Sequence, residues 1–560
     1  MTALLLPTMM LADKKPMPNG VSKLTASRLH RAPRAAEGQG VTAKLKYEKI
    51  ADMTVARMGH QVFPSGDGFV VVGGRTTGFQ LTRTAELYQN GSWQSLSIGS
   101  AHDGAFSVRL NDGRYMVGGG FSRGGGNGQS QATDIYDPTS HTFSAGPQLT
   151  TARAQSMAIN VGGQVYVSGN WYASDPTMDC YNGKAFTAVG DMDGRSNPYM
   201  LANQAGEVLV FSGYNTEGKD FGYYTFDDGS QNLLGDSYSP ATGKTKYLAL
   251  PFSPQAALMP LPDDARPSDY RIYENGINYY MILTRTSNGY QLYMIDMENL
   301  KFYLYNTFNI PTTDTATGAA ITWRGSVLVN QQRQELYLIG TSGPATNQTL
   351  HVISLNYISD EWTIASATGF RHNLLSASWT LLADGRLACT GGGIYDNTDA
   401  QRTVYIVTPT VAGQSDDTPT PPANGPRLVV WLKSGEKVVY ELAESPITTF
   451  SGSQLVISTV KTTATYERKN VLRYTYEDVF YSGIDLQPGE RHVQVNRDGD
   501  EVSFYGLPAG TVASVYAVNG MLVKQLTSAE GQPLTVSLRN HPNGVYIVKA
   551  GTETIKVMKQ

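Results

Sequence analysis

The stretch FVVVGG, Phe69 to Gly74, joins a β-branched apolar run to a pair of glycines. Such a run favours a strand, and glycine at its end permits a sharp bend with positive φ. A glycine pair that holds a phosphate would instead lead into a helix whose first amides face the anion. The following residues, RTTGFQLTRTAELY, do not suggest a helix, so we interpret the pair as the corner of a sheet.

The same corner recurs along the chain. It reads YMVGG at 115–119, VYVSG at 165–169, VLVFSG at 208–213, LYLIG at 336–340 and LACTGG at 387–392. The first four corners end at positions 74, 119, 169 and 213, which lie 45, 50 and 44 residues apart. In the longer gap before position 340, the segment Asn278–Tyr305 alternates like strands and predicts one irregular unit.

Each regular unit has an apolar strand, the glycine corner, a variable loop, and a strand with spaced aromatic residues. A repeat of this length with about four short strands is typical of propeller blades. One blade cannot bury both of its faces alone, so blades stack around a channel. We therefore predict an all-β chain whose residues 42–410 form a β-propeller of about seven blades, with six as the alternative number.

The first unit carries Gly73, Gly74, Tyr88 and Trp93, a glycine pair followed by spaced tyrosine and tryptophan. In this pattern the chain resembles the Kelch repeat family. The resemblance implies a Kelch-type β-propeller. It is weaker in the fourth to sixth units, which leaves the number of blades open.

Composition excludes some classes of function. The 560 residues carry a net charge of −4 and a pI near 6.1, which gives no basic surface for nucleic acid. The two cysteines, Cys180 and Cys389, form neither a disulfide framework nor a zinc motif. The segment Asp191–Arg195, DMDGR, lacks the later ligands of a calcium loop. We expect no cofactor and no bound metal.

The N-terminal sequence predicts export. Residues 1–12, MTALLLPTMMLA, have the length and apolar character of a signal peptide core and are interpreted as its remnant. They are too short to span a bilayer, and no other stretch approaches the ~20 apolar residues that a membrane helix needs. Further on, Ala43–Lys49 is expected to close the ring by pairing with the blade that contains Trp379–Val407.

Three segments follow the propeller. Residues 411–426 form a Pro-rich linker, 427–480 a small antiparallel β module, and 495–560 a C-terminal β-sandwich. The last segment contains YAVNGMLV, HPNGVYIVKA and the closing Lys556 and Lys559. In these features it resembles the type A C-terminal sorting domain of the type IX secretion system of Bacteroidetes. That resemblance implies the secretion machinery as a partner and a secreted or outer-membrane surface location.

Basic residues recur at one place in the repeat. They stand 16 to 18 residues before the glycine corner in four units, and 21 before it in the last. They are Arg57, His102, Arg153, Arg195 and Arg371, with His60 and His372 as neighbours. Guanidinium forks would suit a carboxylated or polyhydroxylated ligand. The alternative is a structural role, in which the same side chains hold the blades together.

Aromatic residues begin several loops at the corners. These are Trp171, Tyr172 and Tyr214. Exposed rings at such positions can stack on the apolar face of a sugar, while packing against a neighbouring blade is the alternative.

Two functions fit these features. The favoured one is an exported or cell-surface Kelch propeller that binds a glycan or a protein. The alternative is a carbohydrate-active enzyme on the same ring, resembling neuraminate epimerases or, less well, copper-radical oxidases of the galactose oxidase type. Oxidases of that type require a metal with a cysteine-linked tyrosine, and the sequence shows no paired-histidine motif. The sequence leaves open whether the protein is an enzyme and which substrate it would act on.

Overall fold

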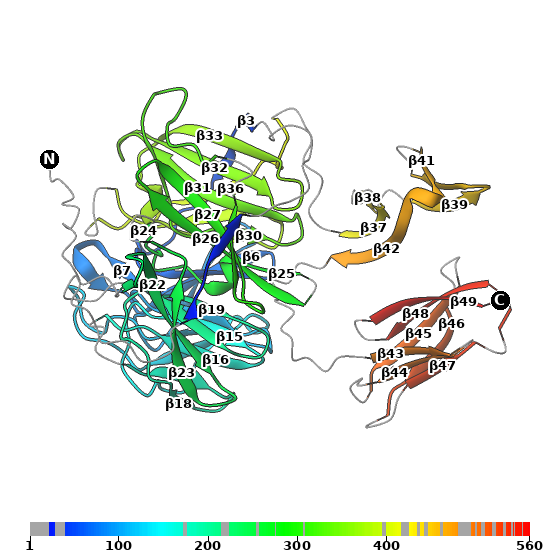
Figure 1. Ribbon diagram of the computed structural model, residues 1–560, viewed down its shortest axis with the longest axis horizontal. Coiled ribbons are helices and arrows are strands. Elements are labelled where there is room, and N and C mark those ends of the chain that lie inside the picture. Colours follow the sequence, from blue (N-terminus) through cyan, green and yellow to red (C-terminus); the bar gives the residue numbers. More distant parts are fainter. Residues whose placement is uncertain are drawn as a thin grey trace. The chain divides into compact units, whose positions relative to one another are not determined.

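A computed structural model describes most of the chain (Figure 1). The described residues are 22–28, 40–171, 176–213, 223–253, 257–274, 276–305, 309–394, 399–415, 425–433, 437–441, 446–459, 463–479, 494–498, 501–505, 510–517, 522–529, 534–538, 541–542, 544–550 and 553–559. The predicted signal remnant 1–12 and residues 416–424 of the predicted linker lie outside them. The chain divides into two compact units, Met1–Asp485 and Leu486–Gln560.

The protein is all-β, as predicted, and seven sheets follow one another between residues 61 and 408. The first contains β5 (Gln61–Ser65), β6 (Gly68–Val72), β9 (Thr84–Gln89) and β10 (Ser92–Ser97). The second contains β11 (Phe106–Arg109), β12 (Tyr115–Gly118), β13 (Thr133–Asp137) and β14 (Thr142–Ala145). The third contains β15 (Met157–Val161), β16 (Gln164–Ser168), β17 (Met178–Tyr181) and β18 (Phe186–Val189).

The later sheets are longer and less regular. The fourth contains β19 (Tyr199–Ala202), β20 (Val208–Phe211), β21 (Tyr223–Thr225), β22 (Gln231–Ser239) and β23 (Lys244–Leu250). The fifth contains β24 (Ala257–Leu258), β25 (Arg271–Glu274), β26 (Ile277–Thr286), β27 (Gly289–Asp296) and β28 (Lys301–Tyr305). The sixth contains β29 (Ile321–Trp323), β30 (Leu328–Asn330), β31 (Glu335–Ser342), β32 (Gln348–Asn356) and β33 (Trp362–Phe370). The seventh contains β34 (Ser378–Leu381), β35 (Leu387–Thr390) and β36 (Val404–Thr408). The irregular unit predicted at Asn278–Tyr305 is confirmed as strands β26 to β28.

The apolar run Phe69–Val72 forms most of β6, and it needs no polar positions because both faces of its sheet are buried. Val70 and Val72 pack in one cluster with Tyr115 and Val117 of the second sheet. The alternate residues of β6 pack in another cluster with Ala388 of β35 and its neighbours in the seventh sheet. A strand covered on both faces needs no polar alternation. The core therefore lies between neighbouring sheets.

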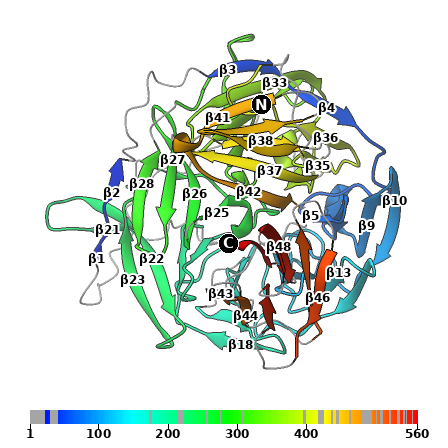
Figure 2. The ribbon, with the colours of Figure 1, turned by 90° about the vertical axis from the view of Figure 1, so that its right-hand side faces the viewer.

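Backbone hydrogen bonds link the first three sheets in sequence and also join the seventh sheet to the first. The amide of Gly74 donates to the carbonyl of Ala101 at 2.8 Å, and that of Gly120 donates to Arg153 at 2.8 Å. The equivalent bond from Gly392 reaches Arg57, before the first sheet, also at 2.8 Å. Figure 2 shows the sheets following one another around a common centre. The seventh sheet is therefore joined to the first by the same contact that joins the first sheet to the second and the second to the third.

An N-terminal strap runs along the outer edges of the last four sheets. Its strands are β1 (Ser22–Lys23), β2 (Ala26–Arg28), β3 (Val41–Lys44) and β4 (Lys46–Lys49). The first three pair in parallel with β23, β28 and β33. The fourth pairs antiparallel with β36 and completes the seventh sheet. The expected pairing of Ala43–Lys49 with that sheet is confirmed for Lys46–Lys49, whereas Ala43 and Lys44 pair with the sixth sheet.

The remaining elements are short. The residues after Gly74 form β7 (Arg75–Thr76), the 3-10 turn η1 (Thr77–Phe79) and β8 (Gln80–Leu81), so no α-helix follows the first glycine pair. Three more 3-10 turns lie among the described residues: η2 (Pro267–Tyr270), η3 (Leu374–Ser376) and η5 (Arg468–Asn470). Among the described residues, no helix has the length and apolar character needed to cross a membrane.

Two further pairs of sheets lie after residue 424. One pair consists of β37 (Gly425–Leu432), β38 (Lys437–Glu441) and β42 (Val471–Val479), and of β39 (Ile447–Ser451), β40 (Gln454–Ser458) and β41 (Thr463–Glu467). The unit from Leu486 onward has one sheet of β43 (Gln494–Asp498), β44 (Glu501–Tyr505) and β47 (Leu534–Ser537). Its other sheet has β45 (Val512–Ala517), β46 (Leu522–Thr527), β48 (Gly544–Ala550) and β49 (Glu553–Lys559). All of these strands pair antiparallel.

Candidate functional site

The glycine corners define one end of the seven sheets. In the first sheet, β5 begins and β6 ends there, because Gln61 pairs with Val72. Gly73 follows with a φ of 65°, and a Cβ on it would lie 2.0 Å from the carbonyl oxygen of Ala101. Glycine is therefore required both for the bend and for the close approach of the next sheet. We call this the glycine-corner end; it carries Gly73, Gly119, Gly169, Ser212 and Gly391.

Arg57 is buried beneath the first corner, where it binds its own sheet. Its Nη1 donates to the carbonyl of Gly73 at 2.8 Å and to that of Thr84 at 2.7 Å. Its Nη2 forms a salt bridge with Glu86 Oε1 at 2.9 Å. Both partners are almost fully buried, at 0% and 1% exposure. The guanidinium thus joins the corner to the third strand of the sheet.

Glu86 is held ionised by its hydrogen bonds. Burial alone would raise the pKa of this carboxyl, but hydrogen bonds from Thr54 and Arg57 hold it below its usual value. The backbone amides of Thr54 and Val55 donate to the carboxylate at 2.7 and 3.1 Å. A buried carboxylate with this many donors stabilises the segment that precedes the sheet.

The arrangement is repeated in the next three sheets. Arg153 Nε contacts Asp179 at 2.6 Å and its Nη1 contacts the carbonyl of Gly169 at 3.2 Å. Arg195 Nη2 contacts Asp236 at 2.6 Å, and its Nη1 contacts the carbonyl of Ser212. Each arginine therefore bridges a corner carbonyl and a carboxylate of the third strand.

His102 takes the place of the arginine in the second sheet. Its Nδ1 lies 3.0 Å from the carbonyl oxygen of Gly119, and its Nε2 lies 2.8 Å from Asp134 Oδ2. The imidazole thus lies between a corner carbonyl and a carboxylate of the third strand, as the guanidinium groups do in the other sheets. The amides of Gly99 and Ser100 donate to the same carboxylate.

These contacts favour the structural alternative for the four basic residues. Arg57, His102, Arg153 and Arg195 are at most 1% exposed, and each pairs with a carboxylate of its own sheet. From the sequence, these basic residues had two possible roles, ligand binding and holding the blades together. Direct contact of these side chains with a ligand stays a prediction, and the geometry does not favour it.

The carboxylate partners were missed by the sequence analysis, although the sequence contains a signal for them. They are Glu86, Asp134, Asp179 and Asp236, each two residues before a tyrosine of the third strand: Tyr88, Tyr136, Tyr181 and Tyr238. Residues two apart in a strand lie on the same face. The acidic residue two positions before each repeat tyrosine therefore identifies the partner of the basic residue in the same unit.

The other predicted basic residues lie elsewhere. His60 is buried, and its Nε2 contacts Thr390 Oγ1 of the seventh sheet at 2.8 Å. His372 is also buried, with its ring centroid 6.5 Å from that of Tyr405. Arg371 is exposed, in keeping with its different spacing from the corner. The structure therefore does not gather all seven basic residues into one ring.

Aromatic and charged side chains occupy the loops of the first three sheets at this end. The ring of Trp171 stands edge-on to Phe121, with centroids 5.5 Å apart. The guanidinium of Arg75 lies 5.5 Å from the ring centroid of Phe79 and pairs with Asp103 at 2.5 Å. Two other predicted aromatic positions, Tyr172 and Tyr214, lie outside the described residues.

Asp103 has a shifted acidity. Burial raises the pKa of its carboxyl to about 7, with the charge of Asp263 adding to the effect and that of Arg75 opposing it. A carboxyl that titrates near neutrality can exchange a proton at physiological pH. The described residues contain no group of three His, Cys, Asp or Glu side chains that could hold a metal ion.

Comparison with known proteins does not assign the chain to a family. The chain matches no protein-family model, and no curated protein matches it.

Proposed function

We propose that residues 42–410 form a seven-bladed Kelch-type propeller that binds a glycan at the glycine-corner end. The succession of seven sheets supports the blade count, and the bond from Gly392 to Arg57 supports a closed ring. The repeated base–carboxylate pairs support equivalent units.

The observation that carries a glycan ligand is a pair of partly exposed loop aromatics at this end, Phe79 and Trp171. Phe121, from the loop of the intervening sheet, is 6% exposed and packs against Trp171. Partly exposed rings offer apolar faces to pyranose C–H groups, and the neighbouring Arg75, whose side chain is 11% exposed, offers a polar contact. Arg371 extends the exposed charge at the seventh sheet.

Asp103 favours the second candidate, a carbohydrate-active enzyme on the same ring. The pKa of its carboxyl, about 7, suits a general acid or base, but the side chain is 1% exposed and is bonded to Arg75, so catalysis by Asp103 requires Arg75 to move aside. An epimerase acting on a carboxylated sugar would need free basic residues to bind the carboxylate. Four of the predicted basic residues already face internal carboxylates, which weakens that form of the alternative.

A glycan array combined with an NMR mutarotation assay on the full chain distinguishes the two. Glycan binding without accelerated anomer exchange supports the binding module. Accelerated exchange that is lost in Asp103→Asn supports the enzyme. Binding to a protein from the same surface, with no glycan retained, would replace the glycan by a protein ligand.

Export and surface display are the second part of the proposal. They are supported by the apolar residues 1–12 and by the resemblance of the C-terminal segment to sorting domains. Mass spectrometry of the mature protein from culture fluid and from outer membranes tests this, because cleavage at either end shortens the chain. A full-length protein confined to the cytoplasm would contradict it.

A further inference from the structure

The inner edge of the fifth sheet is interrupted. β24 pairs with Thr284 and Arg285 of β26, while β25 pairs with residues 277–280 of the same strand. Between them, the segment Met259–Tyr270 leaves the sheet. No repeat or motif in the sequence marks this segment.

One set of hydrogen bonds ties the segment to the first and seventh sheets. Gln61 Nε2 donates to the carbonyl of Asp263 at 2.7 Å. Arg266 donates through Nη1 to the carbonyl of Val62 and through Nη2 to Thr380 Oγ1. Arg266 is 5% exposed, so this guanidinium is an internal link rather than a surface charge.

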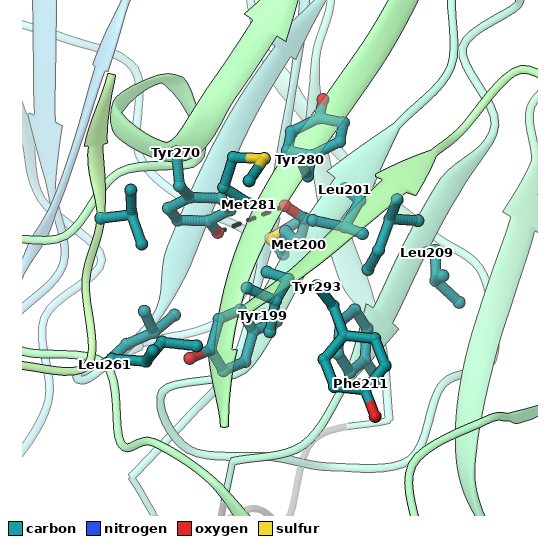
Figure 3. Close-up of a cluster of buried hydrophobic side chains, with 14 of the residues drawn as sticks. Tyr199, Met200, Leu201, Leu209, Phe211, Leu261, Tyr270, Tyr280, Met281 and Tyr293 are labelled. Carbon is teal, nitrogen blue, oxygen red and sulfur yellow. Dashed lines mark hydrogen bonds between the residues drawn. The ribbon is translucent and has the colours of Figure 1, made fainter. Parts of the chain in front are cut away.

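A second set reaches the sixth, seventh and fourth sheets. Asp264 pairs with Arg324, which follows β29, and accepts the amide of Trp379 of β34 at 2.6 Å. The hydroxyl of Tyr199, in β19, donates to the carbonyl of Met259 at 2.8 Å. Figure 3 shows Leu261 and Tyr270 of the segment among the buried side chains of the fourth and fifth sheets.

The segment contacts β5, β19 and β34, which are edge strands of their sheets. In the fourth and seventh sheets, the strap pairs with the opposite edge, so the segment lies on the inner side of the sheets. Gln61 pairs with Val72, next to the first corner, so the residue it holds, Asp263, lies toward the glycine-corner end. The two neighbouring acids differ. Asp264 is 3% exposed and paired, whereas Asp263 is only partly buried and its charge reaches Asp103.

We propose that Met259–Tyr270 is a plug that closes the inside of the ring and presents Asp263 at the glycine-corner end as a specificity-determining residue. The proposal rests on the proposed function, and it names the ligand class. A ligand at the glycine-corner end would meet the carboxylate of Asp263. The four basic residues of the repeat are already paired with carboxylates inside their sheets. The site therefore favours sugars with ammonium or hydroxyl donors and disfavours carboxylated sugars.

Thiol labelling tests the plug without any ligand. Both native cysteines, Cys180 and Cys389, are buried and give a low background with a maleimide reagent. The folded Asp263→Cys variant is expected to react at least tenfold faster than Ala265→Cys, because Ala265 is 6% exposed. Equal labelling rates in the two folded variants would show that Met259–Tyr270 does not lie in the ring as proposed.

Binding of defined sugars tests the specificity. The probes are a glucosamine tetrasaccharide, an N-acetylglucosamine tetrasaccharide and sialyllactose, measured on the full chain. We expect the wild type to prefer the amino sugar, and Asp263→Asn to lose about tenfold in affinity for it with little change for the neutral sugar. Asp112→Asn, an exposed acid between β11 and β12 at the other end of the second sheet, is the matched control and should change nothing.

The outcomes separate the two proposals. Preference for sialyllactose, or an unchanged preference in Asp263→Asn, overturns the specificity while leaving a glycan-binding function. If no probe binds at all, the proposed function and the specificity both fall, and the labelling experiment still decides whether the plug exists.

Discussion

The backbone amide of Gln155 donates a hydrogen bond to the carbonyl oxygen of Gly104 at 2.7 Å. The same contact joins Gly104 to Gly59 at 2.9 Å and Asn197 to Gln155 at 2.8 Å. All four residues have positive φ, from 49° to 62°, and each stands two positions after the repeat base of its unit. The repeat base thus fastens the corner within one sheet, while the backbone just after it fastens that sheet to its neighbour.

Close approach at the corner predicts a larger effect at Gly73 than at Gly78. Both have positive φ, 65° and 72°, so alanine strains the backbone at either site by about 1–2 kcal/mol. A Cβ at Gly73 would also lie 2.0 Å from a backbone oxygen, whereas nothing lies within 4 Å at Gly78. Urea denaturation should therefore show Gly73→Ala to be clearly the less stable variant. Equal losses would mean that the corners are not in contact.

The buried pairs predict a large cost for a single substitution. Glu86→Gln leaves Arg57 buried without its counter-charge, so we expect a loss of about 3–5 kcal/mol in the free energy of unfolding. The double variant Arg57→Met/Glu86→Gln should recover part of this loss, because no unpaired charge remains. Denaturant unfolding of all three proteins measures both effects.

The exposed pair Arg114–Asp112 is the matched control. Its side chains are 39% and 50% exposed, so Arg114→Met should cost under about 1 kcal/mol. If Glu86→Gln cost no more than Arg114→Met, the buried pairs would not hold the corners.

The sequence allowed the repeat to be found because strand, corner and aromatic residues recur locally. FVVVGG predicted a strand and a bend, and β6 and Gly73 have both. The basic residues were found at their repeat positions, but their function depends on Glu86 and its equivalents in the third strand. The pairing was within reach, since each carboxylate precedes a repeat tyrosine by two residues.

The pairing of Lys46–Lys49 with the seventh sheet was predicted, but the plug and the first three strap strands could not be predicted in this way, because their partners are distant in sequence. Asp264 meets Arg324 and the amide of Trp379, neither of which any local pattern connects with it. The first three strap strands are two to four residues long and pair in parallel with distant strands. Strands this short carry no readable periodicity.

Two buried groups affect the dependence of stability on pH in opposite directions, and His372, whose pKa burial lowers to about 4, acts in the same direction as His60. Burial lowers the pKa of His60 to about 3, below its unfolded value of about 6.5. The unfolded chain alone then binds this proton, so stability is lost as the pH falls below 6.5, by about 2 kcal/mol at pH 5. Asp103 acts in the other direction, because its folded pKa of about 7 lies above the unfolded value of about 3.9. Its contribution is present at low pH and is lost as the pH rises through 7.

Urea denaturation at pH 7.5 and 5.0 tests both signs. His60→Gln should reduce the loss of stability between the two values, and Asp103→Asn should increase it. His141→Asn, in the turn between β13 and β14, should leave the difference unchanged. A change of the same sign in His60→Gln and Asp103→Asn would contradict the assignment.

Because the N-terminal strap pairs with the last four sheets, we predict that its residues contribute to the thermal stability of the protein. Leu45 is 2% exposed and packs between the sixth and seventh sheets, while the side chain of the adjacent Lys46 is exposed. Leu45→Ala should lower Tm by roughly 5–10 °C, whereas Lys46→Ala should change it by less than about 2 °C. Deleting residues 1–49 should lower Tm further, because the seventh sheet also loses the strand β4 that pairs with β36. An unchanged Tm after the deletion would show that the ring closes without the strap, and the closing bond from Gly392 to Arg57 would then have to suffice.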